Sequence, residues 1–302
     1  MTEPLLMRDA GLKAGTPARP DREGWHRVAA GVYVPWESWE AASARERHMT
    51  LIEAAVAKYS DELVLTSASA ALASGIPFVG RVPDRVQCVG GTGQRKRTTL
   101  VARSERALEA GDVVVIDGHA MTRPEVTAID LARTGGLVPG VVAMDWMLHE
   151  SRVEQAGLEE AVERLPRRAR GRAAARTAVR LADGLSESPG ESLSRVRMWQ
   201  AGLPRPDLQA TFAPGGRERR VDFLWPEAAV FGEHDGRVKY SASSFGRNPE
   251  DVMRDEYERD LELRRLGLTP AHWGWKDAWH GEGGRMLDVL ARVGVAPIGR
   301  RW

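Results

Sequence analysis

The sequence predicts an α+β chain, because two kinds of local pattern alternate along it. Short apolar runs with a period of two residues, as in Arg219–Tyr240, indicate strands, and capped segments with apolar residues at helical spacing indicate helices. The 302 residues are enough for about two domains of ~150 residues each. Apolar residues make up 42% and charged residues 28% of the chain, a balance typical of a globular protein.

The composition excludes several classes of protein. No stretch reaches the ~18 consecutive apolar residues of a membrane helix, and the first residues, MTEPLLMRDAGLK, lack the pattern of a secretion signal. Cys88 is the only cysteine, so an intramolecular disulfide and a cysteine-based zinc site are excluded, which favours a reducing cytoplasm. The net charge is only +1, so any affinity for nucleic acid must come from local patches.

Residues 1–40 form the first predicted part. Trp25–Val34 predicts a small hairpin, and Gly11–Gly24 has the glycine, proline and charge of a loop. A strand ending in GVYVP resembles the wing of the N-terminal winged helix in AbiEi-type antitoxins, where a helix-turn-helix comes first. Here that place holds KAGTPARPDREG, a poor helix former, so we expect a degenerate winged helix. An ordered hairpin without function is the alternative.

Residues 41–163 form the second predicted part. Capping-box patterns at Ser43–Glu46 and Thr122–Glu125 predict the starts of two helices. The run DVVVID at Asp112–Asp117 predicts a buried strand, and Val138–Leu148 predicts an apolar helix. These patterns indicate that strands and helices alternate along this part.

The segments GDVVVIDG, TRPEVTAIDLAR and DWML, in this order, resemble the middle domain of the AbiEi-type antitoxins. The likeness spans roughly residues 25–150 and implies DNA and a cognate toxin as partners, with self-association as an alternative. Asp130 and Asp145 lie in this part. They could be catalytic, but their positions favour acids that cap helices or lie on helix surfaces.

Residues 164–184 predict a basic helical linker. Three arginines spaced by four residues share one face of its helix. They are Arg172, Arg176 and Arg180. These arginines are either a stripe that contacts DNA phosphates or a solvated face paired with acids such as Glu159 and Glu163.

Residues 185–302 predict an α/β domain, and its centre carries a cluster of acids. Asp222 lies on the first strand of Arg219–Tyr240, and Glu233 and Asp235 leave one face of the second. Lys239 follows. Three carboxylates beside a lysine suit a hard divalent cation and a phosphodiester reaction. The alternative is that the acids lie at strand ends, where Asp and Gly form turns.

This stretch resembles the core of the PD-(D/E)XK nucleases, in the branch related to very-short-patch-repair endonucleases. The likeness rests on Val221-Asp222-Phe223, Trp225-Pro226 and Glu233-His234-Asp235-Gly236. It implies a mixed sheet flanked by helices, with Mg²⁺ or Mn²⁺ held by Asp222, Glu233 and Asp235. Lys239 would stabilise charge on the phosphate. Two residues depart from the pattern: Asp235 stands where the superfamily has Lys, and Lys239 where this branch has His.

Two further residues enter the predicted site through this resemblance. Ser188-Pro189-x-Glu191 has the pattern of a helix cap. In the resembling nucleases the first helix brings an acid to the metal, so Glu191 is either an auxiliary ligand or only a cap. Arg254, on a helix that begins after Asn248, would face the substrate phosphate or be ordinary surface charge.

Two functions follow from these patterns. The first is a Mg²⁺-dependent endonuclease acting on DNA, with Asp222, Glu233, Asp235, Lys239 and Glu191 as its site. The second is a non-catalytic DNA-binding regulator, similar to an antitoxin, whose nuclease fold only grips DNA or a partner. Retention of three acids favours the first function, and the aspartate in place of lysine favours the second. A protein-interaction module is a third alternative.

Overall fold

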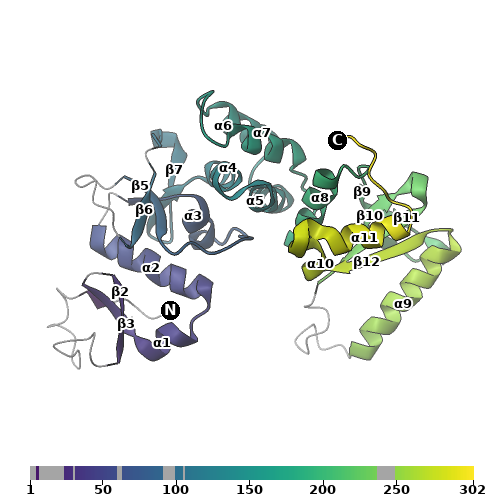
Figure 1. The fold of residues 1–302 in the computed structure, drawn as a ribbon, viewed down its shortest axis with the longest axis horizontal. Helices are drawn as coiled ribbons and strands as arrows, with labels where there is room; N and C mark the ends of the chain where they lie inside the picture. The colour runs from purple at the N-terminus through teal and green to yellow at the C-terminus, as the bar shows by residue number, and fades with distance from the viewer. Residues whose placement is uncertain are drawn as a thin grey trace. The chain divides into compact units, whose positions relative to one another are not determined.

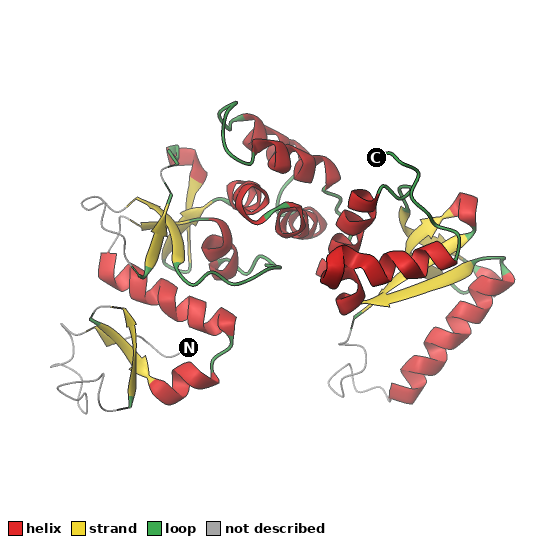
Figure 2. Ribbon diagram, in the orientation of Figure 1, coloured by secondary structure: helices red, strands yellow, loops and turns green. Residues whose placement is uncertain are grey.

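The computed structural model describes residues 5–6, 24–29, 31–59, 63–90, 99–104, 106–236 and 249–302. It confirms the α+β class, with helices and mixed sheets (Figure 2). The chain divides into two compact units. Unit 1 comprises Met1–Ala143 and Val153–Arg180, and unit 2 comprises Met144–Arg152 and Leu181–Trp302. None of the helices in the described ranges is both long enough and apolar enough to cross a bilayer.

Unit 1 begins with a small antiparallel sheet of order β1-β3-β2. Its strands are β1 (Leu5–Leu6), β2 (Trp25–Ala29) and β3 (Val32–Pro35). β2 and β3 form the hairpin predicted at Trp25–Val34. The segment where a helix-turn-helix would precede this hairpin lies outside the described residues, so the degenerate winged helix remains a prediction. A short helix, α1 (Trp36–Ala41), follows the hairpin.

The second sheet of unit 1 has five strands in the order β6-β5-β4-β8-β7. They are β4 (Leu63–Leu65), β5 (Val86–Gly90), β6 (Val101–Arg103), β7 (Val113–Ile116) and β8 (His119–Thr122). The expected strand at Asp112–Asp117 forms, as β7, but the prediction that it is buried is wrong. In the part of the chain that the structure describes, β7 lies at the edge of the sheet beside β8, and Val115 is 70% exposed.

Helix α2 (Ala44–Tyr59) lies between the two sheets of unit 1 (Figure 1). Ala29 of the hairpin, Ile52 of α2 and Cys88 of β5 belong to one buried apolar cluster, so α2 joins both sheets into one core. The predicted capping box at its start is confirmed. The Ser43 amide donates to Glu46 Oε2 at 2.8 Å, and the Glu46 amide donates to Ser43 Oγ at 3.3 Å.

Five further helices complete unit 1 or cross its boundary. They are α3 (Ser67–Ala73), α4 (Pro124–Gly135), α5 (Leu137–His149), α6 (Gln155–Glu163) and α7 (Arg172–Leu181). The capping box expected at Thr122–Glu125 does not form. Pro124 occupies the first helical turn, Thr122 still belongs to β8, and its Oγ1 lies 2.7 Å from Thr127 Oγ1. Proline at the first position starts the helix too late for Thr122 to cap it.

Asp130 on α4 is not the surface acid that its position predicted. Only 5% of Asp130 is exposed, and its Oδ1 binds two guanidinium groups. Arg106 Nη1 lies at 2.6 Å and Arg133 Nη1 at 2.8 Å. Burial of a carboxylate is tolerated because charged donors replace the water that it loses.

Unit 2 is built on a four-stranded mixed sheet of order β12-β11-β10-β9. Its elements are α8 (Pro189–Ala201), β9 (Asp207–Phe212), β10 (Arg219–Trp225), β11 (Val230–Asp235), α9 (Pro249–Arg265), β12 (Thr269–Gly274), α10 (Trp275–Trp279) and α11 (Gly284–Arg292). β9, β10 and β11 are antiparallel neighbours, and β12 runs parallel to β11 after the α9 crossover. The sheet flanked by helices that the sequence predicted therefore forms.

Helices α8 and α9 pack against opposite faces of β11. His234 lies directly against Gly190 of α8, where a Cβ atom would collide with its ring. Phe231, three residues earlier and of opposite parity, packs with Leu263 of α9. The α9 face therefore also receives Glu233 and Asp235, and His234 packs on the opposite face from these acids, as predicted.

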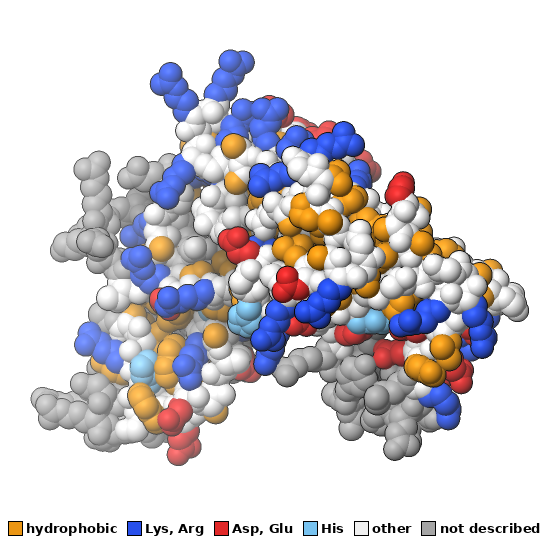
Figure 3. Space-filling model, turned by 45° about the vertical axis from the view of Figure 1, so that its right-hand side comes forward, with side chains coloured by type: hydrophobic (Ala, Val, Ile, Leu, Met, Phe, Trp, Pro, Cys, Tyr) orange, Lys and Arg blue, Asp and Glu red, His pale blue; other side chains and the backbone are white. Residues whose placement is uncertain are grey.

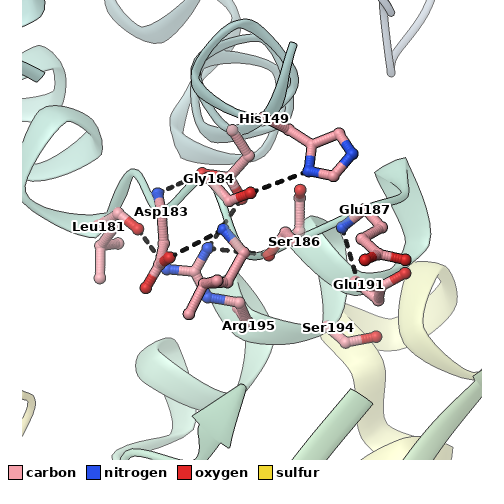
Figure 4. A network of polar contacts seen from close by, with 12 residues as sticks. His149, Leu181, Asp183, Gly184, Ser186, Glu187, Glu191, Ser194 and Arg195 are labelled. Atoms are coloured by element: carbon pink, nitrogen blue, oxygen red, sulfur yellow. Dashed lines mark hydrogen bonds and ion pairs between the residues drawn. The ribbon is translucent and has the colours of Figure 1, made fainter. Parts of the chain in front are cut away.

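A buried ion pair anchors α8 inside unit 2. Arg195 Nη1 lies 2.8 Å from Asp145 Oδ2, with the two side chains 3% and 0% exposed. Arg195 also donates to Ser186 Oγ at 3.1 Å and to the Leu181 carbonyl, as Figure 4 shows. Asp145 is thus a core residue rather than the surface or capping acid that the sequence predicted. Burial raises the pKa of Asp145 to about 6, although Arg195 opposes this rise.

Arg195→Met should destabilise unit 2 by about 3–5 kcal/mol, because it leaves Asp145 buried without its countercharge. The double variant Asp145→Leu/Arg195→Met should regain most of that loss, since no isolated charge remains. Urea denaturation of the full chain, followed by tryptophan fluorescence, measures both. Arg220→Met, which breaks the exposed ion pair with Glu187, is the control and should cost at most about 1 kcal/mol. A similarly small cost for Arg195→Met would show that the buried pair contributes little.

Candidate functional site

Asp222 lies at the end of the β10–β11 ladder, just beyond the pair formed by Phe223 and Gly232. Its Oδ2 accepts the backbone N–H of His234 at 2.9 Å. The Asp222 carboxylate therefore binds the neighbouring strand, next to Glu233, instead of extending into solvent. Glu233 itself is only 3% exposed.

Glu191 reaches the same region from the first turn of α8. Its Oε1 accepts the Ser188 hydroxyl at 2.6 Å, and its Oε2 accepts the Glu187 amide and Gln209 Nε2, each at 2.9 Å. Burial, and then the negative charge of Asp222, raise the pKa of Glu191. The predicted cap is thus present, and the structure also brings Glu191 within electrostatic range of Asp222.

The two acids of β11 are opposed by cations of the protein itself. Arg259 Nη2 lies 3.4 Å from Glu233 Oε2. His272 Nδ1 lies 3.5 Å from Asp235 Oδ2, and its Nε2 lies 2.9 Å from Asp260 Oδ2. Hydrogen bonds to Asp235 and then to Asp260 raise the pKa of His272 to about 10, so this ring is protonated at neutral pH.

The charges around these residues bear on the Mg²⁺ site that the resemblance implied, which stays a prediction. Among the residues that the structure describes, no three His, Cys, Asp or Glu side chains form a group that could hold a metal ion. Guanidinium and imidazolium groups stand beside two of the three expected ligands, where a divalent cation would supply the positive charge. The predicted Lys239 falls in the segment outside the described residues.

The sequence did not identify Arg259, Asp260 and His272 as parts of this network. His272 is the parallel partner of Glu233, a position that only the register of β11 with β12 reveals. Arg259 and Asp260 come from α9, the helix of the β11–β12 crossover. The sequence shows that α9 carries many charged residues, but no local pattern indicates which of them face the sheet.

The predicted arginine stripe forms on α7, and two of its members share an acid. Arg172 Nη2 lies 2.7 Å from Glu163 Oε2, and Arg176 Nε lies 3.3 Å from Glu163 Oε1. Arg180 is exposed, as is Arg254 on α9. Figure 3 shows lysine and arginine side chains gathered at the top of the view, where Figure 1 places α6 and α7. The pairing with Glu163 agrees with the second alternative, and contact of the stripe with DNA phosphates stays a prediction.

His272 should make the stability of unit 2 depend on alkaline pH. Its folded-state pKa lies above its ordinary value of 6.5, so its stabilising charge is fully present below about pH 6.5 and is lost as pH rises through 10. His272→Gln should remove about 1–2 kcal/mol at pH 6, after allowance for solvent screening, and nearly nothing at pH 10.5.

Urea denaturation of wild type and variant at the two pH values measures this effect. The contributions of other titrating groups cancel when the free energies of unfolding of the two proteins are subtracted. His280→Gln, at an exposed position, is the control. NMR titration of the His272 ring with a midpoint near 6.5 would contradict the ion-pair network.

Comparison with known proteins assigns one part of the chain. The sequence model of the AbiEi antitoxin C-terminal domain family matches residues 76–178. Two uncharacterized proteins of Mycobacterium tuberculosis, MT2308 from strain CDC 1551 / Oshkosh and Rv2248 from strain ATCC 25618 / H37Rv, are similar. Each is 34% identical over 155 residues, or 51% of this chain and 54% of the relative. No solved structure matches.

The chain thus spans about half the length of the curated relatives that it matches. The matched family segment runs from just after α3, through β5 to β8, to most of α7. It therefore lies largely in unit 1 and contains the buried Asp130 cluster and most of the arginine stripe. Residues 76–178 of this protein match an AbiEi antitoxin C-terminal domain.

Proposed function

We propose that this protein is a non-catalytic DNA-binding regulator of the antitoxin type. The observation that carries the proposal is the match of residues 76–178 to the AbiEi antitoxin C-terminal domain. In this proposal unit 1 provides the antitoxin function in the cytoplasm, with a cognate toxin as its partner. Unit 2 contributes a binding surface with a nuclease-like arrangement of strands and no hydrolysis.

The charges of unit 2 support a binding role over a hydrolytic one. A hydrolytic metal site gathers acids whose repulsion the metal relieves. Here Arg259 approaches Glu233 and protonated His272 approaches Asp235, so the protein already neutralises those acids. A surface whose acids are paired with basic side chains can serve as a rigid scaffold without a metal ion.

The charges of α7 support DNA as a partner. Its buried face carries Ala175, Ala178 and Val179, and its opposite face presents Arg176 and Arg180. A helix of this kind is fixed by its apolar side and offers guanidinium groups at one-turn spacing to phosphates. Arg172 is mostly withdrawn from this face, because its side chain is 15% exposed and bound to Glu163.

Arg176→Gln/Arg180→Gln should weaken binding of the full chain to mixed-sequence duplex DNA. The slope of log K against log salt should fall in magnitude by about 1.8, the value for two phosphate contacts. Fluorescence anisotropy over a range of NaCl concentrations measures the slope. Arg285→Gln/Arg292→Gln, two exposed arginines of α11, are the matched control and should leave it unchanged. An equal effect of both pairs would mean that net charge, and not α7, governs binding.

A Mg²⁺- or Mn²⁺-dependent endonuclease is the second candidate, and one observation favours it. Glu191 of α8 is close enough to Asp222 of β10 for the charge of Asp222 to raise its pKa. This pair comes from the same two elements that the nuclease resemblance implied. Metal binding would still require Arg259 to leave Glu233 and His272 to leave Asp235.

The endonuclease proposal predicts that Mn²⁺ at one hundred times its Kd increases the free energy of unfolding by about 2.7 kcal/mol. The melting temperature should rise accordingly. Asp222→Asn should abolish that gain and any DNA cleavage, while the amide oxygen still accepts the His234 N–H. The metal-free variant should be at least as stable as wild type, because one like charge is removed beside Glu191. Glu227→Gln, in the exposed turn after β10, is the control. No effect of Mn²⁺ on either protein would leave the regulator as the sole candidate.

A further inference from the structure

A basic hollow of about 740 Å³ opens in unit 1, and neither the antitoxin match nor the nuclease resemblance assigns it. We call it the Arg106 pocket. The charged residues that line it are Arg106, Glu109, Asp112, Arg133, Arg164 and Arg170. They come from the segment before β7, the end of α4 and the loop between α6 and α7. Parts of the chain that are distant in sequence therefore bring four guanidinium groups to one cavity.

Among the residues that the structure describes around the Arg106 pocket, positive charge exceeds negative charge. Arg106 and Arg133 share a single oxygen of the buried Asp130, at 2.6 and 2.8 Å. Arg164 Nη2 lies 3.2 Å from Asp112 Oδ1, which is the second acid. With Glu109 counted as well, the described residues place three carboxylates beside four guanidinium groups. Since a guanidinium has five N–H donors, the shared contacts with Asp130 leave donors for an added anion.

The wall of the pocket is fixed in place before any ligand arrives. Gly171, at φ +77°, packs on the end of α4 so closely that a Cβ atom would lie 2.5 Å from the Arg133 carbonyl oxygen. Arg133 Nε donates to the Arg170 carbonyl at 3.0 Å. On the other side, the Glu109 amide donates to Asp112 Oδ2 at 3.2 Å. Because these walls are already fixed, the protein loses little side-chain and loop entropy when a ligand binds.

We propose that the Arg106 pocket binds a phosphate group on a ligand of nucleotide size. Planar guanidinium forks can bind two oxygens of a phosphate group at once. The cavity volume falls within the ~300–1,000 Å³ range of small-molecule sites. Leu165 and Pro166 add an apolar wall for the rest of the ligand. The phosphate is carried by a free small molecule or by the 5′ end of a nucleic acid strand.

The proposal goes beyond the regulator function and stands independently of it. A duplex bound along the α7 arginines needs only its backbone phosphates, whereas the Arg106 pocket takes one phosphate inside a cavity. Duplex DNA without terminal phosphates should therefore bind the pocket variants as tightly as wild type. A failure of duplex binding would weaken the regulator proposal and leave the pocket proposal untouched.

Calorimetric titration of the full chain with pyrophosphate at low salt tests the pocket. We expect binding in wild type and at least tenfold weaker binding in Arg106→Gln and in Arg170→Gln. Arg170 is exposed, so its substitution keeps the fold if removal of Arg106 from Asp130 proves destabilising. Arg81→Gln, whose side chain is 84% exposed in the same unit, is the matched control and should bind as wild type does.

A second arm separates the two sources of phosphate. A short single strand with a 5′-phosphate, compared with its dephosphorylated form, should lose at least tenfold in affinity without the phosphate if nucleic acid is the source. If both strands bind equally and pyrophosphate binds in an Arg106-dependent way, the source is a small molecule. Absence of binding by pyrophosphate and by the phosphorylated strand, or equal weakening by Arg81→Gln, would overturn the proposal.

Discussion

The buried ion pair between Arg195 and Asp145 is the interaction on which the arrangement of unit 2 depends. Removing two charges from water is costly, and the cost is offset only when both groups find partners. Arg195 also binds the Leu181 carbonyl and Ser186, and Asp145 accepts the Asp183 amide at 2.8 Å. These bonds fix the entry to α8, so they also fix where the Ser188 cap and Glu191 lie above the sheet.

The need of a buried charge for a partner of opposite charge also applies to the acids of β10 and β11. Their spacing in the sequence is compatible with a metal site, but Arg259 and protonated His272 supply positive charge to Glu233 and Asp235. The negative charge of Asp222, by contrast, helps to raise the pKa of Glu191. The chemistry of these two inner strands thus depends on residues of α9 and β12 as much as on the acids themselves.

Local signals in the sequence predicted the features that short-range geometry determines. The caps at Ser43 and Ser188 form, since donor and acceptor lie three residues apart, and the β2–β3 hairpin forms around its turn. The partners of Asp130 and Asp145 could not be predicted in this way. Arg106 lies 24 positions from Asp130, and Arg195 lies 50 positions from Asp145, so only the folded chain brings them together.

The candidate site was predictable to a similar extent. Asp222 lies within electrostatic range of Glu191, whereas Glu233 faces α9, on the other side of the sheet from α8. The nuclease resemblance named all three acids as one site, which stays a prediction. It could not place His272, which depends on the register of a parallel pair formed across the α9 crossover. The Arg106 pocket could not be predicted from the sequence for the same reason, since its arginines lie on segments that no local pattern connects.

Cys88 gives unit 1 a built-in chemical reporter. Its thiol is fully buried on β5, within the cluster that joins α2 to both sheets, and burial raises its pKa to about 11. Alkylating reagents need a thiolate that they can reach, so they modify this side chain only while the core of unit 1 is open. Because the chain has no other cysteine, the rate of labelling reports the opening of that core alone, with no contribution from unit 2.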